Sequence, residues 1–258
     1  MESTQLRHMH NIYWSKVILL AISLILMSSL DLRSQGTQKG NYNFWEFRNK
    51  PFYFGLTVGI HSSGFIPSKS REFTNTSNIT LVNGVSKPGL SLNIITNLKI
   101  GQYFDFRFIP GFSFTERQFF FEGEFPSDVN PNETISFDDP SVESVLLETP
   151  LLLRFKSDPY KDKRLFVIGG LRYSFDVASN SRIRRETTTD LLLISPHDFQ
   201  FEIGAGIQFF LPYFIFSPEI KFTRGLNNIN IYNGELDQSR VLDSVISRAF
   251  TISFHFEG

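Results

Sequence analysis

The sequence predicts an all-β fold, an eight-stranded antiparallel transmembrane β-barrel with short periplasmic turns and long extracellular loops. Eight segments alternate apolar with polar residues, and successive side chains of a strand point to opposite faces of its sheet. The connections between these segments alternate between long and short, which is typical of bacterial outer-membrane barrels. The chain has 29 phenylalanines among 258 residues although its mean hydropathy is near neutral, as expected where one face is apolar and the other polar.

The clearest of these segments is 103–114. It places five phenylalanines on one parity, interrupted only by Pro110, and places Asp105, Arg107 and Ser113 on the other. In a water-soluble protein such an apolar face would need a large partner layer, whereas lipid covers it in a transmembrane barrel. We therefore expect lipid contact for a set of phenylalanines on several strands, namely Phe104, Phe106, Phe108, Phe201 and Phe216.

Residues 1–34 have the order of a secretory signal peptide. Arg7 and Lys16 precede the apolar stretch 17–30, and cleavage is expected after Ser34. The alternative is a retained anchor helix, but the stretch is short for a bilayer span of about 20 residues. We interpret 35–50 as a periplasmic lead-in and 51–258 as the barrel.

The eight predicted strands follow one another along the barrel region. The alternation is strictest in 198–210, where every second residue from Phe199 to Phe209 is apolar. Three links are short, the tightest of them at 211–212. The long polar connections are 61–87, 115–143, 178–197 and 225–243. The predicted strands are 52–60, 88–98, 103–114, 144–155, 165–177, 198–210, 213–223 and 245–256.

A soluble eight-stranded barrel of the lipocalin type is the alternative fold. It also alternates apolar and polar residues, but its apolar parity points into a ligand cavity. The polar parity would then face water, which Arg107, Glu148 and Arg172 would tolerate. The long–short alternation of connections, the small residues on the polar parity and the signal peptide favour the transmembrane barrel.

Charged residues on the polar parity predict an ion-pair network in the lumen. Eight strands leave only enough interior for side chains, and burying one unpaired charge costs several kcal/mol. Counting from the short-turn ends places charges of alternating sign at similar heights on five neighbouring strands. We therefore predict a structural ladder that fills the lumen and prevents conduction, formed by Arg107, Glu148, Arg172, Glu202 and Lys221 with Glu219 nearby.

The sequence offers little catalytic or metal-binding chemistry. Cysteine is absent, which excludes disulfides, thiol catalysis and zinc-thiolate sites. His197-Asp198 lies at a strand end, where an outer-membrane enzyme could work, but adjacent residues of an extended chain point apart. An acidic loop could bind calcium, although a solvated loop is the simpler interpretation. We predict no catalytic residue, cofactor or metal; the acidic residues considered are Asp128, Glu133, Asp138 and Asp139.

The net charge and one basic run indicate which binding partners to expect. The 25 basic and 26 acidic residues nearly cancel, so no attraction to nucleic acid is expected. The run Arg182-Ile183-Arg184-Arg185 lies in a polar connection and could meet lipopolysaccharide phosphates, with a solvated loop as the alternative. The expected partners are therefore outer-membrane lipid and lipopolysaccharide.

Three stretches resemble the PorT family of Bacteroidetes outer-membrane proteins. They are 101–111 (GQYFDFRFIPG), 142–155, which begins VESV and ends LRF, and 198–222, which contains DFQFEIG and SPEIKF; the sequence GLNN at 225–228 adds to the last. The resemblance covers most of 50–256 in the same order. It implies a non-enzymatic component of the type IX protein secretion system, which supports gliding in some relatives, and it implies other components of that system as partners.

Two other functions remain open at this point. One is a general small outer-membrane barrel that supports envelope stability or adhesion. The other is an enzyme located at the barrel rim and using His197. Only the resemblance favours secretion over these two, because fold alone does not determine function.

Overall fold

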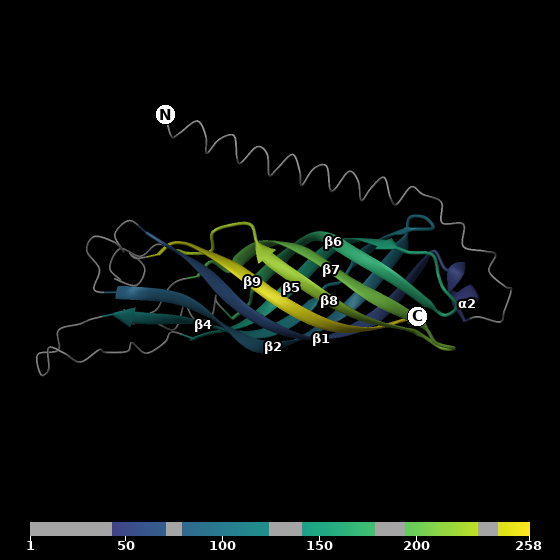
Figure 1. The fold of residues 1–258 in the computed structure, drawn as a ribbon, viewed down its shortest axis with the longest axis horizontal. Coiled ribbons are helices and arrows are strands. Elements are labelled where there is room, and N and C mark those ends of the chain that lie inside the picture. The colour runs from purple at the N-terminus through teal and green to yellow at the C-terminus, as the bar shows by residue number, and fades with distance from the viewer. Residues whose placement is uncertain (1–42, 71–78, 124–140, 179–193, 232–241) are drawn as a thin grey trace, which may run out of the picture. The chain divides into compact units, whose positions relative to one another are not determined.

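The computed structural model describes residues 43–70, 79–123, 141–178, 194–231 and 242–258. In this part of the chain, nine β-strands form one antiparallel sheet (Figure 1). A short helix, α2 (Phe44–Arg48), precedes them. The strands are β1 (Phe52–Lys69), β2 (Ile79–Lys99), β3 (Phe104–Phe108), β4 (Gly111–Gly123), β5 (Ser141–Lys156), β6 (Lys163–Asp176), β7 (His197–Phe210), β8 (Ile215–Gly225) and β9 (Leu242–Glu257).

The sheet closes into an eight-stranded barrel, and we call each of the eight strand positions around its wall a stave. Strand β1 pairs with both β2 and β9, which joins the first and last strands of the chain. Strands β3 and β4 are two parts of one stave, because each pairs with β2 on one side and β5 on the other. Proline has no N–H for the ladder, yet the Pro110 carbonyl accepts a hydrogen bond from the Ile94 N–H at 2.8 Å. The predicted eight-stranded antiparallel barrel is confirmed.

The apolar parity faces outward along the whole barrel wall. Phe104 and Phe201 remain 44% and 43% exposed, and Phe106 is exposed as well. Phe108 and Phe216 are half-buried; the ring of Phe216 lies against other rings of the same outer face, those of Phe254 and Phe256. The opposite parity is buried and mostly polar. The wall is therefore apolar toward lipid and polar toward the lumen, the reverse of a soluble lipocalin-type barrel.

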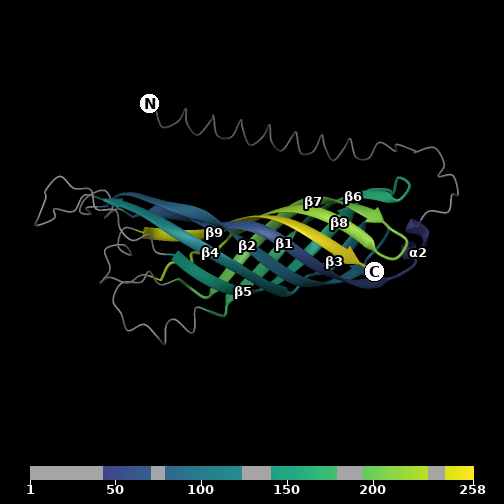
Figure 2. The same ribbon diagram turned by 90° about the horizontal axis from the view of Figure 1, so that it is seen from below.

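Several strands are longer than the sequence predicted. The connections predicted at 61–87 and 115–143 contain the outer ends of β1, β2, β4 and β5. Apolar alternation disappears there because no lipid covers the outer face, while backbone pairing continues. Figures 1 and 2 show β2 and β4 extending away from the barrel end that carries the C-terminus.

The lead-in contains helix α2, which the sequence did not predict. Phe44 and Phe47 pack on Phe210 and Ile215, which flank the short turn between β7 and β8. The Phe44 N–H also donates to the Asp162 carboxylate at 3.2 Å. The predicted signal peptide, 1–34, lies outside the described residues. No helix among the described residues is long and apolar enough to cross a membrane.

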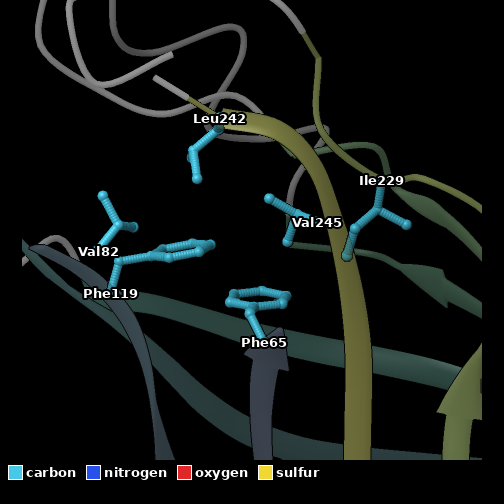
Figure 3. Close-up of a cluster of buried hydrophobic side chains, with 6 residues drawn as sticks. All are labelled: Phe65, Val82, Phe119, Ile229, Leu242 and Val245. Atoms are coloured by element: carbon cyan, nitrogen blue, oxygen red, sulfur yellow. The ribbon is translucent and has the colours of Figure 1, made fainter. Parts of the chain in front are cut away.

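Two further apolar clusters lie inside the barrel. One lies near the outer strand ends, where the rings of Phe65 and Phe119 stack at 4.8 Å between centroids (Figure 3). Its members are Phe65, Val82, Phe119, Ile229, Leu242 and Val245. The other lines the β2–β6 side of the lumen and contains Ile95, Ile109, Leu152, Phe166 and Ile168. Gly206 leaves room for the Phe166 ring, since a Cβ there would lie 2.5 Å from the ring.

Candidate functional site: the luminal charge network

Ten buried charged residues form one connected chain of ion pairs inside the barrel, which we call the luminal network. Five are acidic and five are basic, so their formal charges cancel. In order of contact they are Glu148, Arg172, Glu202, Lys221, Glu219, Arg107, Glu257, Arg154, Asp105 and Lys156.

These residues point into the lumen because of their parity in the strands, and several are two residues apart in the same strand. Residues two apart in a strand share a face, and so Asp105 and Arg107 on β3 both point inward, as do Glu219 and Lys221 on β8. The tilt of the strands then brings together residues from staves that are not neighbours. Arg107, for example, reaches across the lumen to β8 and β9.

The half of the network near the short turns surrounds Arg154. Its guanidinium contacts Asp105 at 2.5 Å and Glu257 at 3.4 Å, and it donates to the Tyr53 hydroxyl. The Lys156 ammonium binds the second oxygen of Asp105. Arg107 then links Glu257, at 2.8 Å, to the other half of the network.

The half near the middle of the lumen centres on Glu219. Its carboxylate lies 3.3 Å from Arg107 and 3.8 Å from Lys221, and 3.1 Å from the Nε2 atom of His255. The other ring nitrogen of His255 shares a 2.7 Å hydrogen bond with the Thr57 hydroxyl. The Glu219 carboxylate and the His255 imidazole therefore lie among charged and polar side chains at the centre of the lumen.

The network continues through Lys221 to its outer end. Lys221 binds Glu202 at 2.8 Å, and Arg172 lies 3.9 Å from Glu202 and 3.2 Å from Glu148. Arg172 also donates to the Gln200 side-chain carbonyl at 2.6 Å. These contacts connect β5, β6, β7 and β8 in order around the wall.

A small polar cavity remains above this outer end. Its volume is about 20 Å³, enough for one water molecule. Its lining includes His61, Asn93, Arg117, Glu148 and Glu202. The luminal network below it and the cluster around Phe65 above it leave no wide aqueous passage through the described residues.

The structure joins all six predicted lumen residues in one network, and five of them are in the predicted order. Glu148, Arg172, Glu202 and Lys221 are neighbours, and Glu219 follows Lys221. The predicted contact between Arg107 and Glu148 is wrong. Arg107 pairs in register with Leu152, four residues from Glu148 along β5, which corresponds to about 13 Å. Counting residues from the short turns did not account for the offset between β3 and β5. Arg107 instead binds Glu219 and Glu257.

Sequence reasoning missed the half of the network near the short turns. The inward parity of Asp105 and Arg154 was readable from the sequence, and Lys156 and Glu257 continue that parity. Their contacts depend on the curvature of the barrel, which sets the residues that face each other across the lumen. Parity therefore identified inward charges but not their partners.

The catalytic candidate His197 does not form a catalytic pair. Its ring is on the exposed outer face and shares a 2.7 Å hydrogen bond with the Tyr173 hydroxyl. The neighbouring Asp198 is buried and accepts a hydrogen bond from Ser247 at 2.5 Å. Among the described residues, no group of three or more His, Asp or Glu side chains could hold a metal ion. The loop candidates Asp128, Glu133, Asp138, Asp139 and Arg182–Arg185 lie outside the described residues.

The family model described as "Outer membrane protein beta-barrel domain" matches residues 34–230. The chain belongs to this outer-membrane β-barrel family. No curated protein sequence matches the chain. As an outer-membrane barrel, the protein resides in the bacterial outer membrane, and its short turns face the periplasm.

Solved outer-membrane proteins resemble this barrel weakly. Neisserial surface protein A is 11% identical, with a TM-score of 0.43, over 80% of this chain and 97% of that protein. OprG from Pseudomonas aeruginosa is 13% identical, with a TM-score of 0.41, over 79% and 96% of the two chains. The attachment invasion locus protein Ail of Yersinia pestis is 9% identical, with a TM-score of 0.33, over 81% and 100%.

Proposed function

We propose that this outer-membrane barrel is a non-enzymatic component of the type IX protein secretion system, of the PorT type, and that it does not itself conduct the cargo. The observation that carries the proposal is the resemblance to that family in 101–111, 142–155 and 198–222. These stretches form β3, most of β5, and the β7–β8 hairpin.

The luminal network adds physical support to this proposal. Seven of its ten residues fall within the three stretches, so the resemblance concerns the filled interior as well as the lipid-facing wall. Those residues are Asp105, Arg107, Glu148, Arg154, Glu202, Glu219 and Lys221.

A filled lumen restricts how such a component could act. Opening a path for a protein would require separating several buried ion pairs, and leaving one partner unpaired costs about 3–5 kcal/mol each time. The barrel therefore acts through its surfaces, by contacting other components of the secretion system in the outer membrane or at either of its faces.

Deleting the gene tests the secretion role. We expect the deletion to abolish release of many cargo proteins into the medium, measured by mass spectrometry of culture supernatants, and the wild-type gene to restore release. An intact secreted fraction together with increased sensitivity to detergent or bile salts would instead support a general envelope role.

One observation favours a second function, adhesion or envelope support by a general small barrel. The outer ends of β1, β2 and β4 continue past the apolar wall and are held together by the cluster around Phe65. Such a projection suits contact with external surfaces. The two functions can be separated by replacing Phe119 with Ser. If adhesion is the function, this variant should bind surfaces less well as whole cells while cargo release stays intact.

A further inference from the structure

Two arginines on the outer face of the barrel lack, among the described residues, the carboxylate partners that the arginines of the luminal network have. Arg224 on β8 and Arg248 on β9 are directly opposite each other in the antiparallel register. Both side chains are exposed. Neither has a carboxylate within 4.0 Å among the described residues. By contrast, Arg107, Arg154 and Arg172 in the lumen each contact two carboxylates.

The two arginines lie where the apolar outer wall ends. The next outward pair toward the short turns is Phe222 and Phe250, which are opposite each other and 48% and 49% exposed. The outward apolar residues of the β8 side of this pair begin at Phe214, directly before β8. Ten residues of a tilted strand separate Phe214 from Arg224, which corresponds to about 25 Å along the membrane normal, the height of the apolar band of an outer-membrane barrel.

This position is at the outer boundary of the membrane. The short turns face the periplasm, and β8 extends away from them beside the antiparallel β9 (Figure 1). The arginines therefore lie at the level of the headgroups of the outer leaflet. In the bacterial outer membrane, that leaflet consists largely of lipopolysaccharide, whose lipid A sugars carry phosphate groups.

The pair places two like charges opposite each other, an arrangement that an anion would stabilise. Like charges directly opposite each other on neighbouring strands are destabilising, and the other residues that oppose them in register, Phe201 on β7 and Gly64 on β1, carry no charge. Guanidinium groups bind phosphate through two parallel hydrogen bonds. One phosphate between the two guanidinium groups would satisfy both charges.

We propose that Arg224 and Arg248 form a binding site for a lipid A phosphate of lipopolysaccharide. The phosphate lies between the two guanidinium groups, and the acyl chains lie against Phe222 and Phe250 on the periplasmic side of them. The site combines a cationic pair with an apolar wall directly beneath it, which matches a ligand with a phosphorylated headgroup and hydrocarbon chains. The inference does not depend on the secretion role.

The test measures lipid binding to the purified full-length barrel in detergent by native mass spectrometry. The probes are lipid A with both phosphates, enzymatically dephosphorylated lipid A, phosphatidylglycerol and inorganic phosphate. The variant is the double substitution Arg224→Gln with Arg248→Gln. Its matched control is Lys50→Gln with Lys161→Gln, which removes two exposed positive charges near the short turns.

We expect phosphorylated lipid A to bind the wild type and the control at least about tenfold more tightly than the arginine double variant, since charge-assisted hydrogen bonds are lost. Arg224→Lys with Arg248→Lys keeps the charge but loses the paired hydrogen bonds, and it should bind with intermediate affinity. The lysine variant also guards against misfolding of the glutamine variant. For each variant, heat-modifiable mobility on gels reports whether the barrel is folded.

Other outcomes would overturn the proposal. Equal binding of phosphorylated lipid A to the wild type and the double glutamine variant would show that the arginines only extend into the headgroup region. Equal binding of dephosphorylated lipid A would remove the phosphate from the interaction. Binding of phosphatidylglycerol or inorganic phosphate as tight as that of lipid A would contradict the glycolipid as the ligand.

Discussion

At the scale of single residues, Glu219 is the carboxylate on which the luminal network depends most. It contacts three basic groups, those of Arg107, Lys221 and His255, whereas among the described residues Glu148 forms an ion pair with Arg172 alone. Removing one partner from a buried ion pair costs about 3–5 kcal/mol, because the remaining charge stays buried. We therefore expect Glu219→Gln to destabilise the barrel by roughly this amount and Glu148→Gln by less.

The measurement is the denaturant midpoint of the barrel refolded in lipid vesicles. Glu143→Gln is the control, because Glu143 is exposed on β5 and surface substitutions usually change the free energy of unfolding by about 0.5 kcal/mol or less. Equal midpoints for the Glu219 and Glu143 variants would mean that the network contributes nothing to stability.

At the scale of strands, orientation was predictable from the sequence and contact partners were not. The parity of Phe104 and Arg107 places one in lipid and the other in the lumen, because a strand has a fixed period of two. The outer ends of β1 and β2 lack apolar alternation, so nothing in their sequence marked them as strands. The contact between Arg107 and Glu257 joins strands that are far apart in the chain. It depends on the tilt and shear that the strands adopt when the barrel closes.

Strand β3 offers a test of the lipid-facing parity. Phe106 is exposed on the outer wall, and an arginine facing lipid costs about 2–4 kcal/mol at the bilayer midplane and about 0–1 near the interface. Phe106→Arg should therefore lower the yield of folded barrel, measured by heat-modifiable gel mobility. Tyr103→Arg, an aromatic residue exposed at the short-turn end of the same stave, should fold nearly as well as the wild type. Equal yields from the two variants would contradict the membrane position of β3.

At the scale of the whole barrel, the filled lumen predicts poor conduction. The network and the cluster around Phe65 occupy the interior, and the described cavity holds about one water molecule. Reconstituted wild-type protein should show no large, stable channels in a planar lipid bilayer. A porin of known conductance in the same bilayer is the positive control, and steady porin-like steps from this protein would contradict a plugged lumen.

The orientation of the barrel in the membrane follows from the same architecture and can be tested without disturbing the fold. The chain has no cysteine, so a single introduced thiol is the only reactive site for a maleimide. Asn83 is exposed near the outer end of β2, and Gln102 is exposed in the short turn before β3. A membrane-impermeant maleimide added to intact cells should label Asn83→Cys but not Gln102→Cys, because the short turns of such barrels face the periplasm. Permeabilising the outer membrane should make Gln102→Cys reactive as well. The reverse pattern in intact cells would place the long connections in the periplasm, and it would also move the Arg224–Arg248 pair away from the lipopolysaccharide leaflet.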